Sequence, residues 1–376
     1  MPIQSPDNPL IIARPEGLYC PAGDFYIDPW RPVARAIITH AHSDHARVGH
    51  GHYLATQAGE QVLRHRLGDI ALQTLRYGEA VSHNGVRISL HPAGHVLGSA
   101  QVRIEVAGEV WVASGDYKVE PDPTCAAFEP VRCDTFITES TFGLPIYRWQ
   151  HSDALFAEIN QWWRANAAQG RVSVLFCYAF GKAQRILRGV DASIGPILTH
   201  GAVAPLNDAY RASGVALPAT RRVAELAARG ENKAAYAGAL VLAPPSAAGS
   251  TWMRRFGDYS DAFASGWMLL RGARRRRGVE RGFVMSDHAD WPGLLWAIEQ
   301  TGAQQVYVTH GQTGVLTRWL GEHGIAAHTF HTQYGDEDEG VGQQQDEATQ
   351  AAAAPMDDAA DSAHRAEQGP EEGAAP

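Results

Sequence analysis

Six consecutive residues, His40-Ala41-His42-Ser43-Asp44-His45, constrain this chain more than any other feature of its sequence. They supply three imidazoles and one carboxylate, which are ligand types that zinc, manganese and iron accept in proteins. The apolar run 33–38 that precedes them is rich in β-branched residues and predicts a buried strand that ends at Thr39. Clustered imidazoles at a strand end have little packing value. The motif therefore predicts metal binding rather than three unrelated surface or core histidines.

Other metal-capable side chains follow other apolar runs, as a shared site would require. Four of these residues follow a predicted strand: His95 after 86–90, Asp116 after 109–113, Glu139 after 135–138, and His310 after 305–309. The fifth, His288, lies in the segment 284–290, which precedes the last of these strands. His91 is the rival to His95, although we expect it to face the strand surface. Asp28 is open to two interpretations, as a carboxylate that orients a metal-binding histidine or as a turn residue before Pro29.

The net charge of −9 is unevenly distributed along the 376 residues. Twelve of the 41 acidic residues and one of the 32 basic residues lie from Gln333 onward, which leaves 29 acidic and 31 basic residues in the body, a net charge of about +2. The acidic balance of the whole chain is therefore no argument against a nucleic-acid substrate.

The chain is long enough for one large or two ordinary domains. Residues 1–150 and 283–333 carry the metal-capable motifs, whereas 151–282 alternate strand and helix patterns and predict an inserted α/β domain. Residues 334–376 contain almost no large apolar side chains and predict a disordered acidic tail.

The cysteine pattern and the apolar runs bear on the cellular compartment. Cys20, Cys125, Cys133 and Cys177 form no Cys-x-x-Cys pair, so we expect reduced thiols rather than a zinc ribbon. We see neither a signal-peptide pattern nor an apolar run of about 18 residues, and expect a cytoplasmic protein without a membrane span.

The motifs together resemble those of a known fold family. His40-x-His42-x-Asp44-His45, His95, Asp116 and the late His310 resemble the metal motifs of the metallo-β-lactamase fold. Glu139 at a strand end, His288 in Ser-Asp-His-Ala-Asp and His310 in Thr-His-Gly are similar to three further motifs of its β-CASP nuclease branch. Residues 18–25 and 138–147 resemble the bacterial ligase-associated DNA damage response exonucleases. The resemblance covers about residues 10–332.

This resemblance implies an α/β fold, namely an αββα sandwich with an inserted α/β domain and two divalent metals between its sheets. Zinc is the first expectation for the metals, with manganese as the alternative. By the family pattern, His40, His42 and His95 would hold the first metal, and Asp44, His45 and His310 the second, with Asp116 bridging. His288 would be the general acid, steadied by Glu139.

The resemblance also implies a DNA exonuclease that acts in repair. The proteins of this group are encoded beside an ATP-dependent DNA ligase and a helicase, which are therefore the implied partners. One residue favours the alternative of an RNA-processing nuclease. The β-CASP branch that acts on DNA crosslinks and hairpins usually has valine where this chain has His310, whereas the RNA-processing branch has histidine. A small-molecule hydrolase for thioesters or lactams, or a metal-bearing binding module, is a further alternative. The predicted insert, the arginine run and His288 argue against it.

Substrate contacts are predicted from charge. Arg274, Arg275, Arg276 and Arg277 form the most basic stretch of the chain. Phosphate contacts from such arginines would make binding salt-dependent and indifferent to base sequence, although a solvated charge run is the usual alternative. Ser246, after a proline pair, and Lys182, after a glycine at a helix start, are weaker candidates for phosphate binding.

Overall fold

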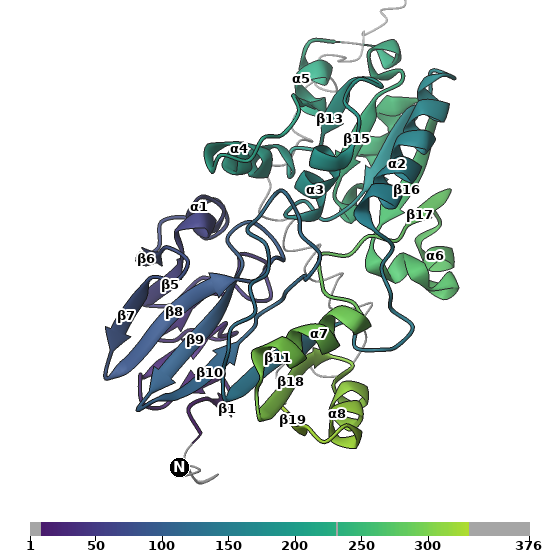
Figure 1. Cartoon of the computed structure of the whole chain (residues 1–376). Coiled ribbons are helices and arrows are strands. Elements are labelled where there is room, and N and C mark those ends of the chain that lie inside the picture. Colours follow the sequence, from purple (N-terminus) through teal and green to yellow (C-terminus); the bar gives the residue numbers. More distant parts are fainter. Residues whose placement is uncertain (1–8, 231, 331–376) are drawn as a thin grey trace, which may run out of the picture.

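Two β-sheets face each other in the part of the chain that carries the histidine motifs (Figure 1). The computed structural model describes residues 9–230 and 232–330, so the predicted acidic tail lies outside the described residues. The first sheet contains, in spatial order, β1 (Ile12–Arg14), β2 (Gly17–Cys20), β3 (Phe25–Ile27), β4 (Arg35–Ile37), β5 (His52–Thr56) and β6 (Leu72–Leu75). The second contains β19 (Ala326–Thr329), β18 (Gln305–Gly311), β11 (Thr135–Ser140), β10 (Glu109–Ala113), β9 (Ala100–Val106), β8 (Val86–Pro92) and β7 (Ala80–His83).

Apolar side chains fill the space between these two sheets. Ile37 of the first sheet and Ile88, Val102 and Ile137 of the second belong to one buried cluster. In β8, Val86, Ile88 and Leu90 alternate with less buried neighbours along part of the strand, as expected where one face of a strand is buried. The inward side chains of both sheets thus form the core of a sandwich.

Helices cover the outer faces of the sandwich. On the first sheet lies α1 (Glu60–Leu67), and on the second lie α7 (Trp291–Thr301) and α8 (Thr313–Glu322). Helix α7 begins after Asp290, whose side chain accepts a hydrogen bond from the Gly293 backbone N–H. It ends before Gly302, which has a left-handed backbone conformation. The predicted layered α/β fold, with helices outside two packed sheets, is confirmed.

A third sheet lies above the sandwich (Figure 1). Its strands are all parallel and run in the order β14 (Arg221–Arg222), β13 (Ile197–Thr199), β15 (Leu240–Ala243), β12 (Val172–Phe176), β16 (Tyr259–Ala264) and β17 (Arg281–Phe283). On one face pack α2 (Ser152–Ala167), α3 (Lys182–Gly189) and α4 (Ala204–Ala212), and on the other α5 (Val223–Ala228) and α6 (Arg271–Arg277). The short 3₁₀ helices are η1 (Gln57–Gly59), η2 (Lys233–Tyr236), η3 (Pro245–Ala247), η4 (Thr251–Phe256) and η5 (Gly266–Leu269).

The elements from α2 to β17 occupy the stretch for which the sequence predicts an insert. The last strand of their sheet extends to Phe283, one residue past the predicted boundary at 282. Its core joins that of the sandwich, because residues of α1 and α4 belong to one buried cluster. The central strands β12 and β15 are buried on both faces, as is typical of parallel sheets covered by helices on two sides.

The carboxyl edge of this parallel sheet faces the histidine motifs. The chain leaves β12 toward Phe180, whose backbone carbonyl lies 3.4 Å from His42 Nε2. It leaves β17 toward Asp287 and His288. Ligand sites of parallel sheets gather at this edge, so the topology places loops of both domains around one position.

One strand is shorter than the sequence predicts. The run expected to end at Thr39 forms β4 only over Arg35–Ile37. The Thr39 backbone N–H donates to a carboxylate oxygen of Asp28 at 2.8 Å instead of to a neighbouring strand. The Asp28 side chain therefore takes the place of an inter-strand hydrogen bond at Thr39, the residue directly before the histidine motif.

Candidate metal centre

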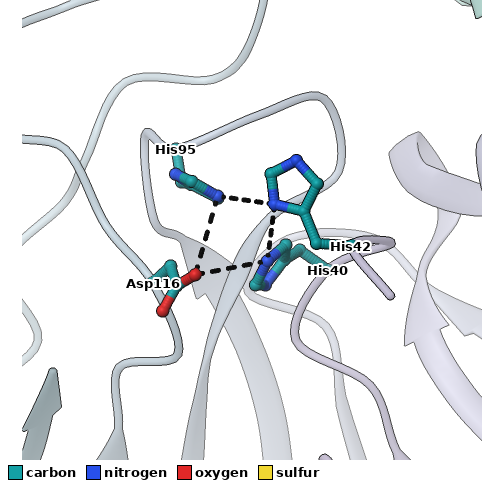
Figure 2. Close-up of side chains that lie close together, drawn as sticks. All are labelled: His40, His42, His95 and Asp116. Carbon is teal, nitrogen blue, oxygen red and sulfur yellow. Dashed lines mark hydrogen bonds and ion pairs between the residues drawn. The ribbon is translucent and has the colours of Figure 1, made fainter. Parts of the chain in front are cut away.

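Four side chains from three loops converge at the end of the sandwich that faces the insert (Figure 2). His42 Nδ1 lies 3.1 Å from His40 Nε2 and 3.0 Å from His95 Nε2. Asp116 Oδ2 lies 3.5 Å from His40 Nε2 and 3.8 Å from His95 Nε2. One ligand-capable atom from each of the four lies within 4.8 Å of the others, which is a spacing that one metal ion can span.

The outer nitrogen of each imidazole is held by a partner. His95 Nδ1 donates to the backbone carbonyl of Asp287 at 2.8 Å, and His42 Nε2 lies 3.4 Å from that of Phe180. His40 Nδ1 lies 3.1 Å from the hydroxyl of Thr39. A carbonyl oxygen only accepts hydrogen bonds, so the proton of His95 and of His42 is outward and the inward nitrogen carries a lone pair.

The surroundings of these imidazoles favour their neutral form. Burial, together with the neighbouring His95, lowers the pKa of His42 to about 3. Burial is also the main cause that lowers the pKa of His40 and of His95. Neutral imidazoles with inward lone pairs are the form in which histidine binds metals.

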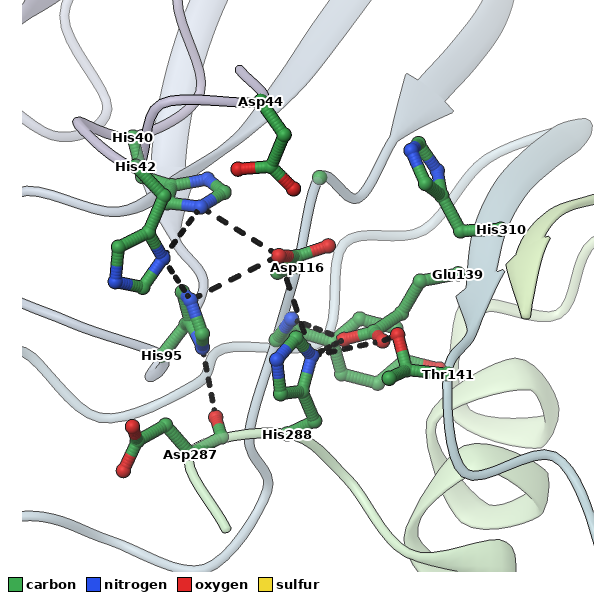
Figure 3. A network of polar contacts seen from close by, with 12 residues as sticks. His40, His42, Asp44, His95, Asp116, Glu139, Thr141, Asp287, His288 and His310 are labelled. Carbon is green, nitrogen blue, oxygen red and sulfur yellow. Dashed lines mark hydrogen bonds and ion pairs between the residues drawn. The ribbon is translucent and has the colours of Figure 1, made fainter. Parts of the chain in front are cut away.

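A second group adjoins the first and shares Asp116 with it. His45 Nε2 lies 3.4 Å from Asp44 Oδ2 and 3.3 Å from Asp116 Oδ2. The ring of His310 stacks on that of His45 with 5.5 Å between centroids, and Asp44, His45 and His310 line one pocket between the two sheets. Figure 3 shows His310 and Asp44 on the same side of Asp116. The structure thus brings His310, which lies late in the chain, next to His45 of the first histidine motif.

His45 provides an observation that tests whether a cation fits this second group. Its buried Nε2 atom has no hydrogen-bond partner among the described residues, yet it faces two carboxylates. Burial lowers the pKa of His45, but Asp116, Asp44 and Asp28 outweigh burial and raise the pKa well above the ordinary value. Three carboxylates around one buried imidazole leave excess negative charge, which a divalent cation would balance. The donor set fits a metal.

Asp28 fulfils both interpretations left open by its sequence. It has a left-handed backbone conformation, with φ of 44°, as a turn residue would. Its carboxylate also accepts from the Thr39 hydroxyl at 2.5 Å and from His45 Nδ1 at 2.7 Å. The second contact fixes the His45 proton on Nδ1 and so turns Nε2 toward the candidate metal.

The partly exposed His288 pairs with the buried Glu139 beside Asp116 (Figure 3). His288 Nδ1 lies 2.9 Å from Oε2 and 3.1 Å from Oε1 of Glu139. Burial lowers the pKa of His288, but the carboxylates of Glu139 and Asp116 raise it to about 9. Glu139 itself accepts from the Tyr117 backbone at 2.8 Å and from the Thr141 hydroxyl at 2.5 Å, so its position is fixed.

The predicted substrate-binding residues occupy different environments. Arg274, Arg275 and Arg276 are exposed on α6, and Arg277 packs over the Phe263 ring at 4.4 Å. Ser246 is exposed in η3, directly beyond the carboxyl end of β15. These five residues remain candidates for substrate binding.

Lys182 differs from its prediction as an open phosphate-binding group. Its side chain is buried, and its Nζ atom lies 3.2 Å from Asp287 Oδ2. An ammonium group paired in this way does not present its charge to a nucleic acid. The sequence carried no signal for this pair, because the two residues lie far apart in the chain and meet only where the insert packs on the sandwich.

Sequence reasoning overlooked Thr141 and Asp287, which hold other site residues. Thr141 contacts Glu139, and the Asp287 backbone contacts His95. The available sequence signals were their positions: Thr141 is a polar residue two positions after Glu139, and Asp287 is an acidic residue next to His288. His91 contacts Ser89 of its own strand at 2.9 Å rather than the metal-capable groups.

Comparison with known proteins gives several relatives, although no family model matches the chain. The chain is 30% identical over 315 residues to a probable DNA ligase of Opitutus terrae, an alignment that covers 83% of this chain and 30% of that protein. It is 31% identical over 124 residues to cleavage and polyadenylation specificity factor subunit 3 of Dictyostelium discoideum, covering 32% of this chain and 16% of that protein. Endoribonuclease YSH1 of Saccharomyces cerevisiae is 33% identical over 124 residues, covering 32% of this chain and 15% of that protein. The chain thus spans less than a third of the length of these relatives.

A solved structure shares the fold. A protein of unknown function from Enterococcus faecalis V583 superposes with a TM-score of 0.55 over 80% of each chain, at 10% sequence identity. At that identity the likeness concerns the fold alone. None of the helices within 9–230 and 232–330 has the length and apolar character needed to cross a membrane.

Proposed function

The chain belongs to the β-CASP family of metallo-β-lactamase-fold proteins, and on that premise we propose that it is a metal-dependent nuclease that hydrolyses phosphodiester bonds of DNA. The observation that carries this proposal is the pair of adjoining ligand groups around Asp116, next to the His288–Glu139 pair. Nucleases need metal charge on the phosphate and a proton for the leaving oxygen, and this site has residues for both.

We propose that His40, His42 and His95 hold the first metal, and that Asp44, His45 and His310 hold the second, with Asp116 between them. Zinc suits this set of imidazoles and carboxylates, and manganese is the alternative. Two divalent cations, when bound, would lower the pKa of a shared water and offset negative charge on the phosphoryl oxygens.

The remaining steps belong to side chains of this protein. Glu139 keeps the His288 proton on Nδ1 and holds the ring in place, while the raised pKa keeps His288 protonated at neutral pH. The protonated imidazole can then donate its Nε2 proton to the sugar oxygen that leaves phosphorus. The exposed arginines of α6 would contact backbone phosphates on either side of the scissile bond.

DNA is proposed as the first substrate because the relative named as a probable DNA ligase is similar over 83% of this chain, whereas the endoribonuclease YSH1 of yeast is similar over 32%. We further propose exonuclease activity in repair, with a DNA ligase and a helicase as functional partners. RNA processing is the second candidate. His310 and the names of the shorter-matching relatives favour it.

A substrate panel tests the proposal. Purified protein would be incubated with labelled single-stranded DNA, duplex DNA, RNA and a chromogenic lactam, with zinc or manganese and with free or blocked ends. We expect metal-dependent shortening of DNA that end-blocking suppresses. The Asp44→Ala variant should be folded and inactive. Turnover of the lactam alone would refute the nuclease proposal, and cleavage of RNA alone would favour the second candidate.

A further inference from the structure

Six charged side chains meet where the insert packs on the sandwich, outside the metal-ligand groups. They come from the loop after Asp116, from the segment before His288, and from α3 of the insert: Lys118, Glu120, Asp122, Lys182, Arg185 and Asp287. Lys182, Arg185 and Asp287 are 4%, 5% and 4% exposed. Charged groups this deeply buried persist only when they are paired, so the cluster has a defined geometry.

Two cations of α3 hold the segment 286–288. Lys182 Nζ lies 3.2 Å from Asp287 Oδ2, and Arg185 Nη1 lies 3.6 Å from Asp287 Oδ1. Arg185 also donates to the Ser286 carbonyl at 2.5 Å, and its Nε atom lies 3.3 Å from Asp122 Oδ2 of the sandwich. The guanidinium thus ties the insert to two segments of the other domain at once.

The segment 286–288 in turn carries two groups of the site. The Asp287 carbonyl accepts the His95 Nδ1 proton at 2.8 Å, which leaves His95 Nε2 free to bind a metal (Figure 3). The Ser286 hydroxyl accepts from the His288 backbone N–H at 3.0 Å. A shift of this segment would move the partner of a metal-binding histidine and the His288 ring together.

We infer that Lys182 and Arg185 are positioning residues, which hold Asp287 so that His95 keeps the tautomer and orientation needed to bind the first metal. The loading of that metal is therefore coupled to the packing of the insert on the sandwich. The link to catalysis rests on the proposed nuclease function, whereas the link to metal affinity does not.

The test removes the buried pair without leaving one charge unpaired. The double variant Lys182→Met with Asp287→Asn keeps the backbone carbonyl of residue 287 but removes the ion pairs that its side chain makes with Lys182 and Arg185. Zinc affinity of the full chain would be measured by competition with a chromogenic chelator, and folding by circular dichroism. We expect a folded protein in which one zinc binds about 10- to 100-fold more weakly, the range for groups that orient a ligand. The single variant Lys182→Arg, which keeps the charge, should stay near wild type.

A control applies the same pair of charge-removing changes to a surface ion pair of the insert. Arg164 and Asp191 lie 2.7 Å apart at the surface, and the double variant Arg164→Met with Asp191→Asn should bind both zinc ions like wild type. Unchanged zinc affinity in a folded Lys182→Met, Asp287→Asn protein would overturn the inference.

If that variant does not fold, Arg185→Lys decides. A lysine keeps the charge but cannot contact Ser286, Asp122 and Asp287 together, so weaker zinc binding is expected and unchanged binding overturns the inference.

Nuclease assays separate the two proposals. Weaker zinc binding in the variants, with wild-type protein inactive on every nucleic acid, would support the positioning role and reject the nuclease. If the protein is a nuclease, the variants should lose kcat at saturating zinc while KM for DNA is unchanged.

Discussion

The Asp28→Asn substitution tests the site at a contact that is one residue removed from the metal. In the native protein, one carboxylate oxygen accepts from the Thr39 backbone and the other from His45 Nδ1 at 2.7 Å. Asparagine keeps the first contact and tolerates the left-handed φ of 44° at this position. Its amide group can only donate where the second oxygen stood. The proton of His45 is therefore driven from Nδ1 to Nε2, the atom that faces the candidate metal.

The size of the effect follows from the lost contact. A hydrogen bond to a charged group contributes about 1.5–3 kcal/mol, which corresponds to roughly a 10- to 150-fold change in a binding constant. Groups that orient metal-binding histidines typically account for about 10- to 100-fold in metal affinity, in agreement with this range. We expect the second metal to bind that much more weakly, with the first metal unaffected.

Stepwise zinc titration against a chelator measures both affinities. Asp134→Asn serves as the control. Asp134 is an exposed carboxylate that accepts from the Val110 backbone at 2.8 Å, and it contacts no imidazole of the residues 9–230 and 232–330. The reasoning is wrong if Asp28→Asn and the control bind both zinc ions equally well.

Three further predictions concern catalysis, substrate binding and stability. His288→Asn should lower kcat on DNA by about 10²- to 10⁴-fold at unchanged zinc content. The loss of kcat should be much smaller on a nitrophenyl phosphodiester, because its leaving group needs no proton. Equal losses on both substrates would exclude the general-acid role. Arg275→Ala with Arg276→Ala should raise KM for DNA and reduce the slope of log affinity against log salt by about one to two, and an unchanged slope would place α6 away from the substrate. Gly311→Ala should lower the free energy of unfolding by about 1–3 kcal/mol, because Gly311 has φ of 70° and an added Cβ would lie 2.5 Å from the Ser140 carbonyl; a wild-type Tm would contradict this.

The sequence by itself determined the layered fold and the chemical character of the site. The histidine motif and the later residues, such as Asp116 and His310, could be found because each follows a run whose apolar pattern marks a strand. The ends of neighbouring strands lie side by side in a sheet, so residues far apart in the chain could be expected in one place. The alternation of strand and helix patterns likewise predicted an inserted α/β domain over 151–282.

Only the tertiary structure decided which polar residues hold the site residues in place. Asp28 was equally compatible with a turn, and Lys182 was predicted to contact the substrate, yet one contacts His45 and the other pairs with Asp287. A hydrogen bond or ion pair depends on the distance and direction between two groups, and neither leaves a periodic trace in the sequence when the partners lie far apart in the chain. Apolar burial repeats along the chain and can be predicted, whereas a single polar contact is fixed only when separate segments of the chain pack together.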